Sequence, residues 1–82
     1  MYYYMICDYA DEAVFWRQVE ILKERIPGLV EDAKLLEDVD GTLVQSFYTP
    51  LVPGGGRLKL VSDVQINYVN IKSTFDIDPY FD

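Results

Sequence analysis

Four apolar residues at helical spacing constrain the fold of this chain more than any other feature. They are Phe15, Val19, Leu22 and Ile26. Because residues three and four positions apart share one face of an α-helix, these side chains form a single apolar stripe. Pro27-Gly28 follows the stripe and ends the pattern. We therefore predict one amphipathic helix over residues 10–25, with Asp8 as its N-cap.

Most of the remaining chain is typical of β-strands separated by turns. Aromatic and branched residues dominate the N-terminus, and apolar residues alternate with polar ones further along. A stretch rich in proline and glycine, residues 50–56, predicts a flexible loop. Strands are predicted over residues 1–7, 42–48, 57–61 and 64–77, with a turn at Ser62-Asp63 and a bulge or bend at Tyr68-Val69, where the alternation changes phase.

Residues 29–40 admit two interpretations. Their composition suits a second short helix, which would present the acidic side chains as a ridge. The Asp40-Gly41 pair instead favours the tight turn of a β-hairpin, because both residues tolerate positive φ. We favour the hairpin, with residues 42–48 as its returning strand.

These elements define the expected architecture. A chain of 82 residues has room for one helix against one small sheet. The expected fold class is therefore α+β, with one N-terminal amphipathic helix packed on a mainly antiparallel sheet in the order β-α-β-β-β, or with one further strand. Residues 1–82 form a single domain in this interpretation. Residues 76–82 are expected to be a mobile acidic and aromatic tail, in which Tyr80 and Phe81 either fold back on the core or project as a docking peg.

The balance of charged residues argues against several classes of function. The chain has 14 acidic residues, 7 basic residues and no histidine, which gives a net charge of −7. This charge disfavours direct binding of nucleic acid, because such binding relies on Lys and Arg against phosphates. The lack of histidine removes the usual general base and the commonest metal ligand. We therefore expect no catalytic residues, no bound metal and no cofactor.

The single cysteine and the hydropathy pattern bear on where the chain acts. Cys7 cannot form an internal disulfide and ends the apolar run Met5-Ile6-Cys7, so we expect it to pack as a small hydrophobe. No stretch approaches the roughly 18 consecutive apolar residues of a membrane span, so no membrane contact is expected. A reducing, cytoplasmic location fits this pattern best.

One short motif resembles an enzyme signature. Asp38-Val39-Asp40-Gly41-Thr42-Leu43 resembles the first motif of the haloacid dehalogenase family of phosphatases. The resemblance implies Asp38 as the nucleophile, Asp40 as the general acid and a Mg²⁺ ion beside them. It covers six residues, and they follow a partly acidic segment where that family has a fully apolar strand. We favour a polar hairpin turn as the interpretation of this motif.

The densest charge in the sequence lies between residues 31 and 40, where five acidic side chains oppose only Lys34. Such a cluster is either a solvated edge that keeps sheets from pairing or a patch that meets a basic groove, where carboxylates stand in for phosphates. Exposed tyrosines near acids suit an interface, because tyrosine buries a large area at low entropic cost. The candidate partner-binding residues are Glu31, Asp32, Glu37, Asp38, Asp40, Tyr3, Tyr80 and Phe81.

Together these observations suggest a binding protein. We expect a small acidic module that docks on a larger protein with a basic or nucleic-acid-binding surface, and that inhibits or regulates it. Small inhibitors that phages make against host nucleases, glycosylases and CRISPR effectors share this character, by analogy alone. The alternative is an accessory or self-associating structural subunit, which would hide the second face of its sheet in a homo-oligomer. A phosphatase at Asp38 and Asp40 is the third hypothesis.

Overall fold

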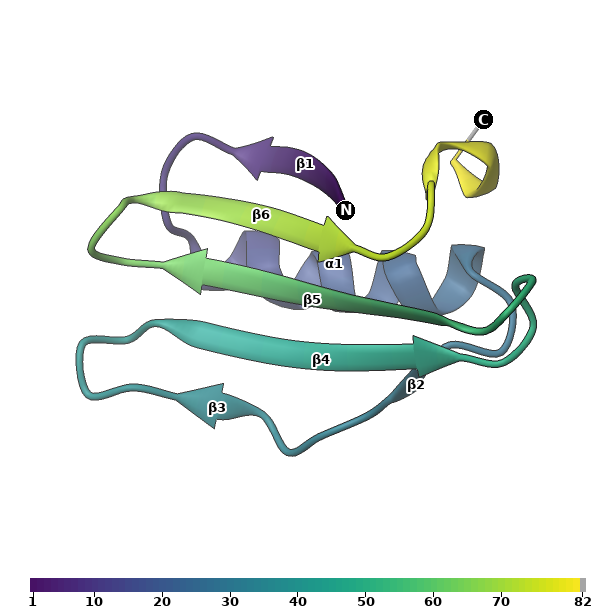
Figure 1. Ribbon diagram of the computed structural model, residues 1–82. Coiled ribbons are helices and arrows are strands. Elements are labelled where there is room, and N and C mark those ends of the chain that lie inside the picture. The colour runs from purple at the N-terminus through teal and green to yellow at the C-terminus, as the bar shows by residue number, and fades with distance from the viewer. Residues whose placement is uncertain (82) are drawn as a thin grey trace.

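The computed structural model describes residues 1–81 and packs one helix against one face of a sheet (Figure 1). The helix is α1 (Glu12–Arg25). The strands are β1 (Tyr2–Cys7), β2 (Val30–Glu31), β3 (Leu36–Glu37), β4 (Leu43–Thr49), β5 (Gly56–Asp63) and β6 (Tyr68–Ser73), and a short 3₁₀ helix, η1 (Asp78–Tyr80), follows them. The predicted α+β fold class, with an N-terminal helix on a mainly antiparallel sheet, is confirmed.

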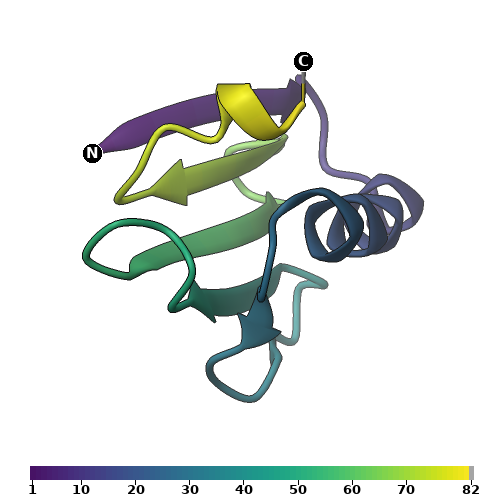
Figure 2. The ribbon, with the colours of Figure 1, turned by 90° about the vertical axis from the view of Figure 1, so that its right-hand side faces the viewer.

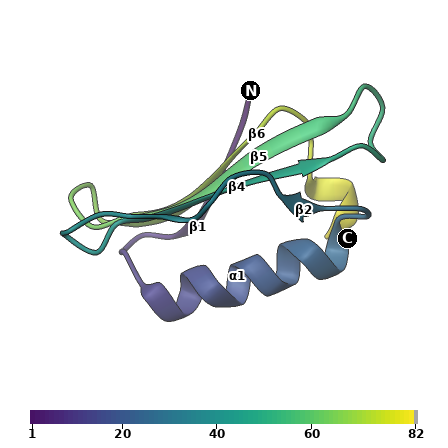
Figure 3. The ribbon, with the colours of Figure 1, turned by 90° about the horizontal axis from the view of Figure 1, so that it is seen from below.

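The strands pair in the order β1-β6-β5-β4-β2, and β3 pairs with β4 next to β2. Every pairing in the described chain is antiparallel. Because β1 and β2 lie at opposite edges, α1 crosses one face of the sheet on its way between them (Figure 3). Within residues 1–81 five strands follow the helix, where the sequence predicted three or four, because residues 29–40 form two very short strands.

The predicted apolar stripe of α1 is buried. Its members Phe15, Val19, Leu22 and Ile26 all lie in the hydrophobic core against the sheet. The predicted N-cap is wrong, because the loop after β1 continues through residue 10 before the helix begins. Asp11 is the N-cap, and its carboxylate accepts a hydrogen bond from the N–H of Val14 at 3.0 Å. Pro27-Gly28 ends the helix as predicted, with Gly28 at a φ of 70°.

The strand predicted over residues 64–77 is shorter than expected at both ends. Residues 64–67 form the turn between β5 and β6. The Asp63 carboxylate holds this turn, because it accepts hydrogen bonds from the N–H groups of Gln65 at 3.0 Å and Ile66 at 3.1 Å. The alternation of Val64 and Ile66 with polar neighbours therefore belongs to a turn, although it has the period of a strand.

Two further details of the predicted sheet need correction. The change of phase at Tyr68-Val69 marks the start of β6 and not a bulge, and Ser62-Asp63 belong to β5 and not to a turn. The irregularity in this sheet lies in β1, where the register with β6 shifts between Met5 and Cys7.

Residues 29–40 form no helix, and the favoured hairpin is confirmed. β3 pairs with β4 through a turn at residues 38–41. The N–H of Gly41 donates to the carbonyl of Asp38 at 3.0 Å, and the N–H of Asp38 donates to the carbonyl of Thr42 at 2.9 Å. Gly41 has a φ of 93°, the conformation for which the Asp-Gly pair is suited.

The C-terminal segment folds back on the core, which is the first of the two alternatives for Tyr80 and Phe81. Both side chains are half-buried and pack against the core, and Ile77 is buried. The ring of Tyr80 meets the edge of Phe75 at 6.2 Å between centroids. Figure 2 shows η1 beside β1, where the hydroxyl of Tyr4 donates to the Asp76 carboxylate at 3.0 Å. Residue 82 of the expected tail lies outside the described residues.

The sheet has one covered face and one open face. α1 and the C-terminal segment pack on the covered face, and no segment of residues 1–81 crosses the other (Figure 3). Within the same residues, no helix has the length and apolar character needed to cross a membrane. Cys7 is a half-buried free thiol that packs beside the core. The two faces and the ends of the strands therefore determine which side chains can meet a partner.

Candidate functional site

Three loops meet at one end of the sheet, on the left in Figure 1. We call this surface the loop end, and it consists of residues 8–10, 38–42 and 63–67. Side-chain hydrogen bonds tie the loops together. The Asn67 side chain accepts from the N–H of Ala10 at 2.9 Å, and the Gln65 side chain donates to Asp40 at 3.3 Å. The loops therefore form one surface, although they come from distant parts of the sequence.

Apolar side chains project from the tips of these loops. Val39 is fully exposed at the second position of its turn, and Ile66 is 66% exposed. Val64 and Tyr9 are 43% and 49% exposed. Turn tips ordinarily carry Gly, Asn, Asp or Ser, and contiguous exposed apolar groups mark interaction surfaces. The aliphatic tips therefore single out the loop end as a candidate interface.

The loop end is also uniformly acidic. It contains Asp8, Asp38, Asp40 and Asp63 and no Lys or Arg. Hydrogen bonds from the backbone and side chain of Thr42, and then from Gln65, hold the pKa of Asp40 below its ordinary value, so this carboxylate stays charged. A hydrogen bond with the Cys7 side chain, followed by the nearby charges, raises the pKa of Tyr9, so its phenol stays neutral.

The structure divides the acidic residues that the sequence grouped together. Asp38 and Asp40 belong to the loop end, and Glu37 adjoins it in β3. Glu31 instead pairs with Lys23 of α1 at 3.0 Å, while Asp32 pairs with Arg57 of β5. Two of the five candidate acids are therefore partly neutralised within the chain.

The aromatic candidates lie apart from the loop end. Tyr3 is 65% exposed in the edge strand β1, on the open face. Tyr80 and Phe81 are half-buried in the C-terminal segment. The loop-end residues Asp8, Tyr9, Asp63, Val64 and Ile66 were not among the binding residues predicted from the sequence. Aliphatic residues enclosed by turn formers, as in Asp63-Val-Gln-Ile-Asn67, were the signal that could have found part of this surface.

The residues that resemble a phosphatase motif hold their own turn. The carboxylate of Asp38 accepts from the N–H of Val39 at 2.9 Å, and that of Asp40 accepts from the N–H of Thr42 at 2.9 Å. Within residues 1–81, no three side chains of the His, Cys, Asp and Glu types gather closely enough to hold a metal ion.

The open face carries a second distinctive arrangement of side chains, in rows across the strands. One row joins Tyr3, Lys72, Lys59 and Ser46, which are successive partners on β1, β6, β5 and β4. In the next row along the strands, Arg57 lies over the ring of Tyr48 at 5.0 Å from its centroid. The open face therefore holds Arg57, Lys59 and Lys72, three of the seven basic residues of the chain.

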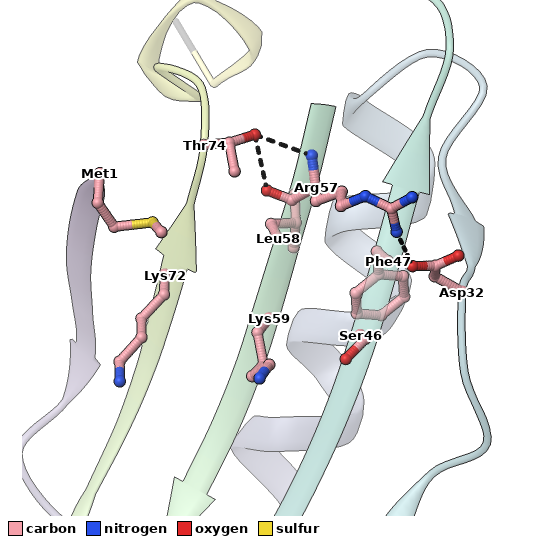
Figure 4. A pocket seen from close by; sticks show the side chains of 9 residues that line it. All are labelled: Met1, Asp32, Ser46, Phe47, Arg57, Leu58, Lys59, Lys72 and Thr74. Atoms are coloured by element: carbon pink, nitrogen blue, oxygen red, sulfur yellow. Dashed lines mark hydrogen bonds and ion pairs between the residues drawn. The ribbon is translucent and has the colours of Figure 1, made fainter. Parts of the chain in front are cut away.

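A shallow hollow of about 210 Å³ lies among these cations. Figure 4 views it from the open face, with Lys59 and Lys72 along one side and the Arg57–Asp32 ion pair along the other. Met1 also lines the hollow, so its lining is partly apolar, whereas Phe47 and Leu58, which border it too, are buried in the core.

Comparison of the chain with protein-family models, with curated proteins and with solved structures gives no match. The features of the chain that bear on function are therefore its two surfaces, the acidic loop end and the cationic open face.

Proposed function

We propose that this chain is a protein-binding module that docks with its loop end on the basic surface of a larger protein and inhibits or regulates it. The observation that carries the proposal is the fully exposed Val39, in a turn that is hydrogen-bonded to the turn bearing Ile66 and Val64, within a surface that has carboxylates and no cation. An apolar centre surrounded by charge is the usual anatomy of a protein interface. The carboxylates would steer the module to a basic partner, and the aliphatic tips would slow its release.

Rigidity supports this role for the loop end. The turns are held by Asp40, Asp63 and Asn67, whose side chains bond to neighbouring loops or to their own backbone. A rigid surface loses little conformational freedom on binding, so more of its contact energy appears as affinity. If the partner binds nucleic acid, the fixed carboxylates would occupy its phosphate sites, and the module would compete with nucleic acid. A free thiol at Cys7 is compatible with action in the reducing cytoplasm.

The proposal is tested by affinity capture with two matched double variants. Val39→Ser with Ile66→Ser removes the apolar tips, whereas Val30→Ser with Leu36→Ser removes exposed aliphatic residues of the short strands β2 and β3. Proteins retained by the wild type and by the second variant, but lost with the first, are partners of the loop end. We expect their retention to weaken as salt rises.

Two results would count against the proposal. One is a set of captured proteins that is the same for both double variants. The other is binding of the isolated partner that does not change when Asp38 and Asp63 are replaced by Asn. Competition by nucleic acid for the isolated partner then separates a partner that binds nucleic acid from one that does not.

Self-association is a second candidate function, and the edge strand β1 favours it. Among residues 1–81, β1 pairs with β6 and with no other strand, and its residues Tyr-Tyr-Tyr-Met-Ile-Cys carry no charge. An uncharged edge strand can pair with another chain. Sedimentation equilibrium of the wild type and of Met5→Lys tests this candidate. A dimer that Met5→Lys dissociates would support it, and a wild-type monomer at high concentration would exclude it.

A further inference from the structure

The open face carries three cations, Arg57, Lys59 and Lys72, on a molecule that is otherwise mainly acidic. Arg57 is already paired with Asp32. Lys59 and Lys72 are exposed, and within residues 1–81 neither has a carboxylate at ion-pair distance. In a chain with a net charge of −7, two lysines left without acidic neighbours form a local site that attracts anions.

The register of the sheet makes this arrangement unfavourable in the free protein. Lys59 and Lys72 are direct partners across β5 and β6, and like charges placed directly opposite each other repel. A carboxylate placed between the two ammonium groups would convert this repulsion into two attractions. The sheet itself does not need this pair, because neutral Ser46 and Tyr3 occupy the outer positions of the same row.

The surroundings of the two lysines suit a peptide with an apolar side chain. The hollow beside them is about 210 Å³ and has the side chain of Met1 in its lining.

We propose that the open face binds an acidic segment of a partner protein, with carboxylates against Lys59 and Lys72 and an apolar side chain in the hollow. Nucleic acid fits this face less well, because a long polyanion would pass from the cations onto Asp63 at the end of β5, whereas a short acidic segment would not reach it. A second copy of the same face fits less well too, because it would bring lysines against lysines. The proposal is independent of the loop end, which has the opposite charge.

The experiment is an NMR titration of the isotope-labelled chain with a defined probe, a five-residue peptide of four glutamates around a leucine. The same peptide with glutamines is the control ligand. We expect the acidic peptide to change the chemical shifts of the backbone amides of β5, β6 and Tyr3, and the glutamine peptide to leave them unchanged. Lys72→Glu and Lys59→Glu are each expected to weaken binding about fivefold, as for loss of one exposed ion pair. Each turns the repelling pair into an attracting one, so both variants should fold.

Arg17→Glu is the matched variant, because it makes the same change in net charge on the exposed side of α1, away from the open face. It should bind the peptide within about twofold of the wild type, the small effect of a distant, screened charge. Equal losses for Arg17→Glu and Lys72→Glu would overturn the proposal. Shifts confined to the loop end would overturn it too, as would tighter binding of a ten-residue oligothymidylate to the open face. The capture experiment tests the loop end alone, so its outcome does not affect the peptide titration of the open face. Each proposal can therefore fail without the other.

Discussion

Lys59 and Lys72 face each other directly across β5 and β6, with both side chains on the open face (Figure 4). Lys23 and Arg57, by contrast, each pair with a carboxylate, that of Glu31 and that of Asp32. The chain has 14 acidic residues, yet within residues 1–81 no carboxylate lies at ion-pair distance from either lysine. The pair is therefore a local cost in the free protein that an anionic ligand would remove.

Replacing Lys72 by Glu is expected to stabilise the protein. The change turns a repelling cross-strand pair into an attracting one, which is worth about 0.5 kcal/mol in the free energy of unfolding. Urea denaturation of the wild type, Lys72→Glu and Arg17→Glu measures the effect. A loss of stability in Lys72→Glu that is absent from Arg17→Glu would show that the lysine pair imposes no cost. A gain in stability together with weaker peptide binding would mark Lys72 as a residue placed for binding.

The N-cap of α1 gives a second test, because the chain offers two nearby aspartates. Asp11→Ala removes the hydrogen bond to the N–H of Val14 and should lower the free energy of unfolding by about 1 kcal/mol. Asp8 makes no cap, so Asp8→Ala should stay within about 0.5 kcal/mol of the wild type. Denaturation curves followed by circular dichroism compare the two variants. Equal effects would contradict the assignment of Asp11 as the cap.

The sequence predicts the elements of this fold wherever one local pattern determines them. The stripe from Phe15 to Ile26 predicts the helix, because its period and its stop signal at Pro27-Gly28 agree. The alternation of Val64 and Ile66 misleads, because a turn held by the Asp63 side chain can have the period of a strand. No local pattern in the sequence distinguishes such a turn from a short strand.

The candidate sites are less predictable, because they depend on residues far apart in the chain. The acidic density near residue 31 is visible in the sequence, but the pairing of Asp32 with Arg57 depends on how β2 and β5 flank β4. The loop end likewise brings Asp8, after β1, to the same end of the sheet as Asp63, at the end of β5, and this depends on the strand order. The row of Tyr3, Lys72 and Lys59 follows from register alone.

Asp40 should give the protein a measurable dependence on acid pH. Its pKa in the folded chain lies below the ordinary 3.8, because Thr42 and Gln65 donate hydrogen bonds to the carboxylate. The unfolded chain therefore binds this proton more readily. The stabilisation is present above pH 3.8 and is lost as the pH falls through the lowered pKa.

Titration of the Asp40 carboxyl carbon by NMR checks this directly, and Gln65→Ala is the informative variant. Loss of one donor should move the pKa of Asp40 upward, towards its ordinary value. In denaturation curves recorded at acid pH, the free energy of unfolding of Asp40→Asn should depend less steeply on pH than that of the wild type. Identical titrations of Asp40 with and without Gln65 would show that the contact between the two turns is absent in solution.

Tyr4 holds the C-terminal segment against the sheet. Its hydroxyl should contribute more to the free energy of unfolding than is usual for a partly exposed group. The hydroxyl accepts from the N–H of Ile77 at 3.0 Å and donates to Asp76 at 3.0 Å. Tyr4→Phe leaves the Ile77 amide without this partner, so we expect unfolding to become easier by about 1–2 kcal/mol. Tyr2→Phe is the matched control, because Tyr2 is exposed in the same strand and its hydroxyl makes no hydrogen bond within residues 1–81.

Two measurements separate this fastening from a general loss of packing. Hydrogen exchange at Ile77 should quicken in Tyr4→Phe before exchange in β5 does, because the C-terminal segment opens first. Burial is the main cause that raises the pKa of Tyr4 above its ordinary 10.0. The hydrogen bond from the Ile77 N–H lowers this pKa, and the hydrogen bond to Asp76 and the charge of Asp76 raise it. The wild type should therefore lose stability as the pH rises above 10.0 towards that raised pKa, and Tyr4→Phe should lose less over the same interval. Equal alkaline losses in both proteins would mean that the Tyr4 hydroxyl does not hold the segment.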